Sequence, residues 1–263
     1  MDDLPPIAAA PEDLHPSLWR ASQVSRSRAA VFASGFDALD AVLPGGGWPA
    51  GVLTELLLPH PGVGELRLLA PVLARQQLER SLMWFDPPAV PCTWALQALG
   101  LHAQQMVLVR GSDALPGSGR ACASVLWALE HALDSGHVGA VLAWLPARLP
   151  ADALRRLQLA AQSHEGPAFL LRSEEAARQA SPAPLRLHLA AAAPDRLRVS
   201  LVKRRGPPLA QPLLLELVPV LAAPALARAQ AAGWVSAGPG AAMRVPPTPL
   251  PAAPPRWSQG SRV

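Results

Sequence analysis

The chain of 263 residues is predicted to fold as an α/β protein with a doubly wound, mostly parallel sheet, helices on both faces and an antiparallel edge. Two observations predict this class. Compact apolar runs alternate with segments of helical periodicity between residues 34 and 171, a rhythm typical of parallel strands buried between helices. Three further strand-like runs lie between residues 185 and 218 with little room for helices between them, which indicates antiparallel pairing.

The strands are predicted from compact apolar runs that end at Pro, Gly or polar residues. In the parallel part these runs are Val52–Leu58, Leu82–Phe85, Met106–Val109, Val138–Leu145 and Ala168–Leu171. The antiparallel edge is predicted to consist of Leu185–Leu189, Leu197–Val202 and Leu213–Val218.

The helices are predicted from apolar residues spaced three and four apart and from the residues that begin or end each segment. Ser34 is expected to cap a short helix that runs through Leu43 and stops at the run of glycines from Gly45. The remaining helices of the core are predicted at Glu65–Arg80, Thr93–Leu99, Cys122–Leu133 and Asp152–Gln162.

Composition divides the chain into four segments: a flexible N-terminus at 1–13, an N-terminal helix arm at 14–30, the α/β core at 31–220, and a disordered Pro-, Ala- and Arg-rich tail at 221–263. The arm either docks on its own domain or binds a partner. If it binds a partner, Trp19 is its candidate contact residue. The N-terminal sequence lacks the basic and then apolar pattern of a signal peptide, and no run of about 18 apolar residues is present, so a cytoplasmic protein without a membrane association is expected.

Lysine chemistry is nearly excluded, because Lys203 is the single lysine among 23 basic residues. A Schiff base or a phosphate-binding lysine would have to use that residue. The two cysteines cannot form a zinc set, and the seven histidines show no ligand spacing, so no metal site is expected.

The turn after the first long strand lies where a doubly wound protein would bind a phosphate. A working phosphate loop needs a Lys and then a Ser or Thr after its last glycine. Here Gly64 is followed by Glu65 and Leu66, and Pro59 removes an amide donor before Gly62. Pro59, Gly62, Gly64 and Glu65 therefore form a vestigial phosphate loop, for which no nucleotide cofactor is expected, since an acid repels a polyphosphate.

Several motifs carry a family resemblance. They are Leu18-Trp19-Arg20, Ser34-Gly35-Phe36-Asp37-Ala38-Leu39-Asp40, Leu43-Pro44-Gly45-Gly46-Gly47-Trp48-Pro49, Thr54-Glu55-Leu56-Leu57-Leu58-Pro59, Gly62-Val63-Gly64-Glu65-Leu66-Arg67, Arg155-Arg156-Leu157-Gln158-Leu159, Ser181-Pro182-Ala183 and Lys203-Arg204-Arg205-Gly206. In order and spacing they resemble the ImuA family of RecA/SulA-like proteins from bacterial mutagenesis cassettes. The resemblance implies a RecA-like core.

The same resemblance implies that the catalytic equipment of RecA is missing. The acid that would activate water falls at Pro88, and the acid that would hold Mg²⁺ falls at Trp144. Together with the lost lysine and hydroxyl, these are four losses, which favour a pseudo-ATPase over an enzyme.

The family resemblance implies a non-catalytic accessory role in SOS-induced, error-prone translesion DNA synthesis. The implied partners are a Y-family-like polymerase homologue of the ImuB type and an error-prone DnaE-type polymerase, with RecA as a further candidate and DNA contacted only indirectly. Two alternatives stay open: a SulA-like cell-division inhibitor and a DNA-dependent ATPase of the RecA type.

Candidate contact residues are basic or aromatic side chains at predicted turns and helix surfaces. Lys203, Arg204 and Arg205 form the densest basic cluster, which binds an acidic partner or a phosphate backbone if it is not a solvated turn. Arg155 and Arg156 lie adjacent on one helix, where a solvated face is the simpler interpretation. Trp48 lies beside the glycines and is expected to be exposed as a contact residue, whereas Trp84, Trp127 and Trp144 are predicted core residues.

Overall fold

The computed structural model describes residues 30–111, 119–206, 209, 211–219, 228 and 231. The predicted N-terminal arm with Trp19 and nearly all of the predicted tail lie outside these residues. The chain separates into two compact units, Met1–Val218 and Pro219–Val263. All the helices and strands given below belong to the first unit.

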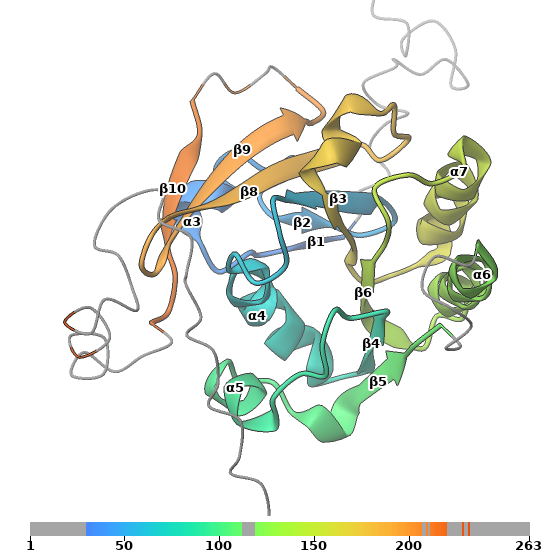
Figure 1. Cartoon of the computed structure of the whole chain (residues 1–263), viewed down its shortest axis with the longest axis horizontal. Helices are drawn as coiled ribbons and strands as arrows, with labels where there is room; N and C mark the ends of the chain where they lie inside the picture. The colour runs from blue at the N-terminus through green and yellow to red at the C-terminus, as the bar shows by residue number, and fades with distance from the viewer. Residues whose placement is uncertain are drawn as a thin grey trace, which may run out of the picture. The chain divides into compact units, whose positions relative to one another are not determined.

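The first unit is built on an eight-stranded sheet with the strand order β10-β9-β8-β3-β7-β6-β4-β5 (Figure 1). Its strands are β3 (Leu53–Leu58), β4 (Ser81–Phe85), β5 (Met106–Val109), β6 (Val138–Trp144), β7 (Ala168–Ser173), β8 (Leu185–Ala193), β9 (Arg196–Lys203) and β10 (Leu213–Glu216). The strands from β8 to β5 pair in parallel, whereas β9 pairs antiparallel with both β8 and β10. The predicted parallel sheet with an antiparallel edge is thereby confirmed.

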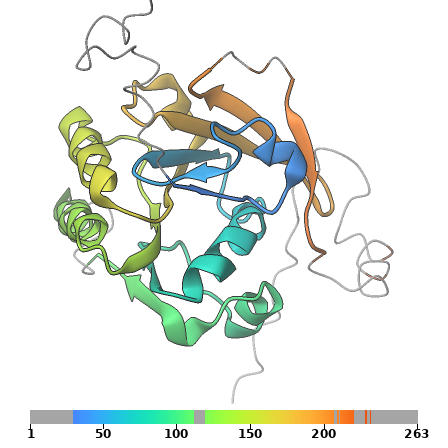
Figure 2. The same ribbon diagram turned by 180° about the vertical axis from the view of Figure 1, so that it is seen from behind.

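Helices cover both faces of this sheet (Figures 1 and 2). The short helices α3 (Asp37–Asp40) and α5 (Thr93–Ala98) lie with α4 (Glu65–Gln77) on one face, and α6 (Gly119–Asp134) lies with α7 (Ala151–Ala160) on the other. The described residues also include the 3₁₀ helices η1 (Ala103–Gln105), η2 (Ala161–Ser163) and η3 (Glu174–Arg178).

The central strand β3 is buried along its whole length, as its apolar sequence predicts. Leu56 and Leu58 pack into the core beneath α4, and Leu53 packs into the core beneath α6 and α7. Because successive side chains of a strand point to opposite faces, β3 contributes to both cores. The carboxyl end of β3 therefore has a fixed position between two packed layers.

A small sheet of β1 (Val31–Phe32) and β2 (Trp48–Pro49) was not expected from the sequence, and it changes the role of Trp48. Gly47 lies so close to β1 that an added Cβ would be 2.4 Å from the Phe32 carbonyl oxygen. This close pairing directs the Trp48 side chain inward, where it is fully buried and contacts the Phe169 ring edge-on at 5.2 Å. The prediction that Trp48 is an exposed contact residue is wrong.

Two other local predictions need correction. Ser34 does not cap a helix through Leu43, because α3 spans only four residues and its N-cap is Phe36. The Ser34 hydroxyl instead accepts a hydrogen bond from the Phe36 amide at 3.1 Å. Trp127 is 61% exposed and stacks on His131 along α6, so of the three predicted core tryptophans it is the one on the surface.

Within the described part of the chain, no helix combines the length and apolar character that crossing a membrane requires.

Candidate functional site

The candidate site is the loop that joins β3 to α4, at the carboxyl edge of the parallel strands. Gly62 and Gly64 adopt positive φ angles of 89° and 119°, which glycine reaches without steric cost. The Gly62 amide donates a hydrogen bond to Glu65 Oε1 at 2.8 Å, and the Gly64 amide donates to Glu65 Oε2 at 3.1 Å. The Glu65 carboxylate thus binds the amides at the start of its own helix.

Glu65 is only 3% exposed, so its carboxylate is part of the protein interior and does not extend into solvent. Backbone amides at a helix N-terminus bind anions because they are unpaired donors in a positive local field. In this loop both amides already have an anionic acceptor, supplied by the chain itself. The Gly62 and Gly64 amides are therefore already engaged by the carboxylate of Glu65.

The antiparallel edge packs against the same loop. A Cβ added to Gly64 would lie 2.8 Å from Leu217 Cδ1 and 3.7 Å from Leu197 Cδ1. Arg67 holds this edge in place, since its guanidinium donates to Asp195 at 2.5 Å and to the Val218 carbonyl at 3.2 Å. Apolar side chains consequently cover the side of Gly64.

A hollow of about 250 Å³ lies beside the loop. Two of its lining residues stand at the positions where the resemblance to RecA would place catalytic acids. Its lining consists of Leu58, Pro59, His60, Pro61, Pro88, Trp144, Leu145, Leu171, Arg172 and Ser173. Pro88 and Trp144, predicted to replace the two ATPase acids, thus both line one cavity with Pro59. These lining residues include neither a carboxylate nor a lysine.

Asp86 directly follows β4 and is the acid nearest to Pro88 in the sequence. Its carboxylate accepts a hydrogen bond from the Gly111 amide at 2.8 Å, and its amide donates to the Val109 carbonyl. The residue has a φ of 47°, a conformation that Asp tolerates better than most side chains. Asp86 therefore holds the turn after β4 against the segment that follows β5.

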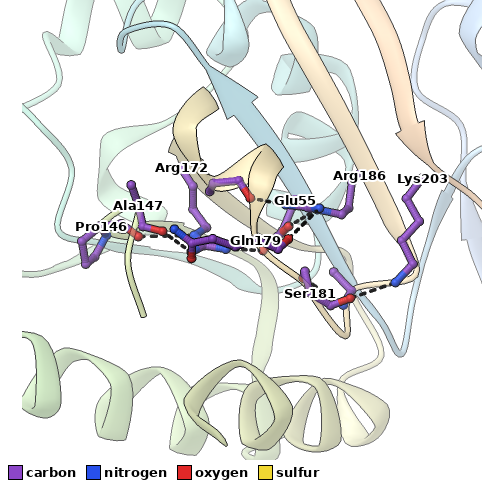
Figure 3. A network of polar contacts seen from close by, with 10 residues as sticks. Glu55, Pro146, Ala147, Arg172, Gln179, Ser181, Arg186 and Lys203 are labelled. Atoms are coloured by element: carbon purple, nitrogen blue, oxygen red, sulfur yellow. Dashed lines mark hydrogen bonds and ion pairs between the residues drawn. The ribbon is translucent and has the colours of Figure 1, made fainter. Parts of the chain in front are cut away.

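A buried network of charges crosses three strands next to this edge (Figure 3). Glu55 on β3 accepts hydrogen bonds from Arg172 on β7 at 2.7 Å and from Arg186 on β8 at 2.5 Å. The three side chains are 0%, 0% and 6% exposed, respectively. The remaining nitrogens of the two guanidinium groups donate to backbone carbonyls, so each buried charge has several partners.

This network was not predicted from the sequence, although the sequence contains a signal for it. Glu55, Arg172 and Arg186 are the charged residues inside otherwise apolar strands, where a charge is rare unless it is paired. The partners lie 117 and 131 residues from Glu55 along the chain, so only the strand order could pair them.

The predicted basic cluster at 203–205 lies at the end of β9, and its three side chains have different surroundings. Lys203 donates to the Ser181 carbonyl at 2.9 Å, and Arg204 donates to the Val42 carbonyl at 2.5 Å beside α3. Arg205 is exposed. Two of the three basic side chains thus hold neighbouring segments of the fold.

The predicted pair of arginines on α7 lies at the protein surface. Arg156 is exposed and forms ion pairs with Glu130 at 2.7 Å and with Asp152 at 3.0 Å. These partners raise the pKa of Arg156, the Glu130 hydrogen bond most strongly. Arg155 is also exposed.

His164, beside η2, is buried with neither ring nitrogen hydrogen-bonded within the described residues. Burial, with a smaller contribution from the nearby Arg80 charge, lowers its pKa from 6.5 to about 4. The imidazole is therefore neutral near pH 7, and it lies outside the loop and the hollow.

Comparisons with known proteins cover the part of the chain that holds the loop. The family model for "Cell division inhibitor SulA" matches residues 51–168, from β3 to the start of β7. A curated cell division inhibitor SulA from Edwardsiella piscicida is 32% identical over 127 residues, which is 48% of this chain and 70% of that protein. The chain belongs to the SulA family. The region matched to the SulA model contains Glu65, Pro88 and Trp144, whereas β8, β9 and β10 lie beyond it.

Proposed function

We propose that this SulA-family chain is a non-catalytic protein of the SOS response that acts by binding another protein. The observation that carries the proposal is the Glu65 carboxylate, which occupies the amides of Gly62 and Gly64. A phosphate entering the loop would have to displace a buried anion that is covalently part of the site. It would also meet no lysine to compensate its charge.

The hollow beside the loop supports the same proposal. Phosphoryl transfer depends on positioned charges that bind Mg²⁺, orient water and stabilise the transferred group. Pro88 and Trp144 stand where such acids would be needed, and Asp86 is engaged by the Gly111 amide. A RecA-like core with these features is a rigid scaffold for binding, and no cofactor is part of the proposal.

Inhibition of cell division is the process that the comparisons favour, because both matches are to proteins described as cell division inhibitors. On this proposal the chain binds a component of the division machinery after DNA damage.

Translesion synthesis is the second candidate process, and a different observation favours it. The core continues beyond the matched region into β8, which pairs with β3, and then into β9 and β10. Leu197 of β9 and Leu217, directly after β10, pack against Gly64 of the loop. The Lys203–Gly206 motif of the resemblance to ImuA begins at the last residue of β9, within this addition. A polymerase homologue of the ImuB type and a DnaE-type polymerase would then be the partners.

One experiment tests both processes. The gene is deleted in its own host, and cells treated with mitomycin C are measured for length and for the frequency of rifampicin-resistant mutants. Loss of damage-induced elongation supports division inhibition, and loss of damage-induced mutation supports translesion synthesis. If neither quantity changes on deletion, the proposed role in the SOS response is wrong.

A further inference from the structure

An open groove of about 1090 Å³ lies at the carboxyl ends of β6 and β7. It is lined by Arg148, Leu149, Glu174, Glu175, Ala177, Arg178, Gln179 and His188. One wall is the segment after β6, the other is η3 after β7, and β8 contributes His188. The carboxyl edge of an open α/β sheet is where ligands of such folds bind.

Both walls of the groove are held by the buried network of Glu55 (Figure 3). Arg172 donates to the carbonyls of Pro146 and Ala147, directly before Arg148. Arg186 donates to the carbonyls of Ala176 and Gln179, on either side of Arg178. Because both guanidinium groups bind the same carboxylate, the two walls keep a fixed separation before any partner arrives.

The charges of the groove are unevenly compensated. Arg148 and Arg178 are exposed, one on each wall, and neither forms a hydrogen bond or ion pair with a described residue. Among the acids, Glu174 is bound to His188 at 3.0 Å, and Glu175 is exposed. Beneath the walls, two guanidinium groups against one carboxylate leave one net positive charge. Since the lining itself holds two guanidinium groups and two carboxylates, this buried charge gives the groove a small net positive charge. The two arginines, unpaired among the described residues, are the positions that can bind carboxylates.

We infer that this groove binds an extended acidic segment of a partner protein, with Arg148 and Arg178 binding carboxylates from opposite walls. The inference rests on the proposed function, since it assigns a surface to the protein contact. Nucleic acid fits the groove less well, because single-stranded nucleic acid is bound mainly by stacking of its bases on aromatic side chains. The lining offers no Phe, Trp or Tyr on which bases could stack.

Fluorescence anisotropy with three labelled probes tests the inference on the full-length chain. The probes are a 15-residue peptide alternating Glu or Asp with Leu or Ala, the same peptide with Lys at the acidic positions, and a 15-nucleotide single strand of DNA. The acidic peptide is expected to bind, the basic peptide to remain free, and the DNA to bind at least tenfold more weakly. Equal or tighter binding of DNA, or no binding of the acidic peptide at 1 mM protein, overturns the inference.

Charge reversal locates the binding. Arg148→Glu and Arg178→Glu are each expected to weaken the acidic peptide by about tenfold or more, because attraction becomes repulsion at close range. The control is the double variant Arg75→Glu/Arg110→Glu, whose two residues do not line the groove. It changes the net charge as much as Arg148→Glu/Arg178→Glu does, and it should bind the peptide as the wild type does. If the control variant loses binding to the same extent as the groove variants, the peptide responds to net charge and the inference is wrong.

A cellular measurement separates this inference from the proposed function. The Arg148→Glu/Arg178→Glu chain replaces the wild-type gene, and damage-induced elongation and mutation are measured as in the deletion strain. If the double variant loses the same damage-induced response that deletion of the gene abolishes, the groove is supported as the partner site. If deletion abolishes a phenotype that the double variant retains, the groove inference fails and the proposed function stands.

Discussion

Replacing Glu55 by Gln removes the one negative charge from the buried network while keeping the size of the side chain. The amide cannot compensate the charges of Arg172 and Arg186, which are 0% and 6% exposed. Two guanidinium groups then remain in the interior without a counter-ion. The walls of the groove also lose the carboxylate that binds both guanidinium groups.

The magnitude follows from the burial of the group. Removing one partner of a buried ion pair costs about 3–5 kcal/mol, because the remaining charge stays desolvated. In a domain of this size each kcal/mol lowers the Tm by roughly 2–4 °C, so Glu55→Gln should lower the Tm by roughly 10 °C.

Thermal and urea unfolding, each followed by circular dichroism, measure this effect. Glu216→Gln is the matched control, because Glu216 pairs with Arg196 at 3.0 Å while both side chains are more than half exposed. That control should change the free energy of unfolding by less than about 1 kcal/mol. A Glu55→Gln protein that unfolds within 1 kcal/mol of the wild type would refute the reasoning on the buried network.

The remaining predictions concern His164 and Gly166. Because the pKa of His164 falls to about 4 in the folded chain against 6.5 when unfolded, its neutral form stabilises the fold fully above pH 6.5. That contribution is lost as the pH falls towards 4. The loss approaches about 3 kcal/mol, at about 1.4 kcal/mol per pKa unit, so His164→Leu should flatten the dependence of urea stability on pH between 7 and 4.5. An unchanged slope in the His164→Leu protein would contradict the assignment. Gly166→Ala should abolish folding or lower stability by more than about 3 kcal/mol, because the added Cβ would lie 1.8 Å from the Gly139 carbonyl oxygen. Gly46→Ala, whose Cβ would meet nothing within 4 Å, should cost only about 1 kcal/mol from its positive φ, and equal losses in the two variants would be the contrary result.

The sheet was predictable because its strands are compact apolar runs. Met106–Val109 coincides with β5, and Leu53–Leu58 differs from the predicted strand by one residue. The small β1–β2 sheet escaped prediction, since two-residue strands are too short to show a period. For the same reason Trp48, beside three glycines, was predicted to be exposed although the pairing of β1 and β2 buries it.

The residue types of the candidate site, and the charge of its acid, could be read from the sequence, whereas the contacts between these residues could not. Glu65 was expected to repel a phosphate, and the structure shows that its carboxylate also binds the Gly62 and Gly64 amides. That contact depends on the positive φ angles of two glycines, which the sequence permits without requiring. The pairing of Glu55 with Arg172 and Arg186 depends on strand order, and no local pattern contains it.

The proposed function requires that the loop occupied by Glu65 neither binds nor hydrolyses nucleotide. Isothermal titration of the purified chain with Mg·ATP, together with phosphate release in the presence of single-stranded DNA, tests it most directly. The account predicts no heat of binding at 1 mM ATP and phosphate release equal to that of buffer. ATP turnover that disappears when Gly64 is replaced by Val would contradict it.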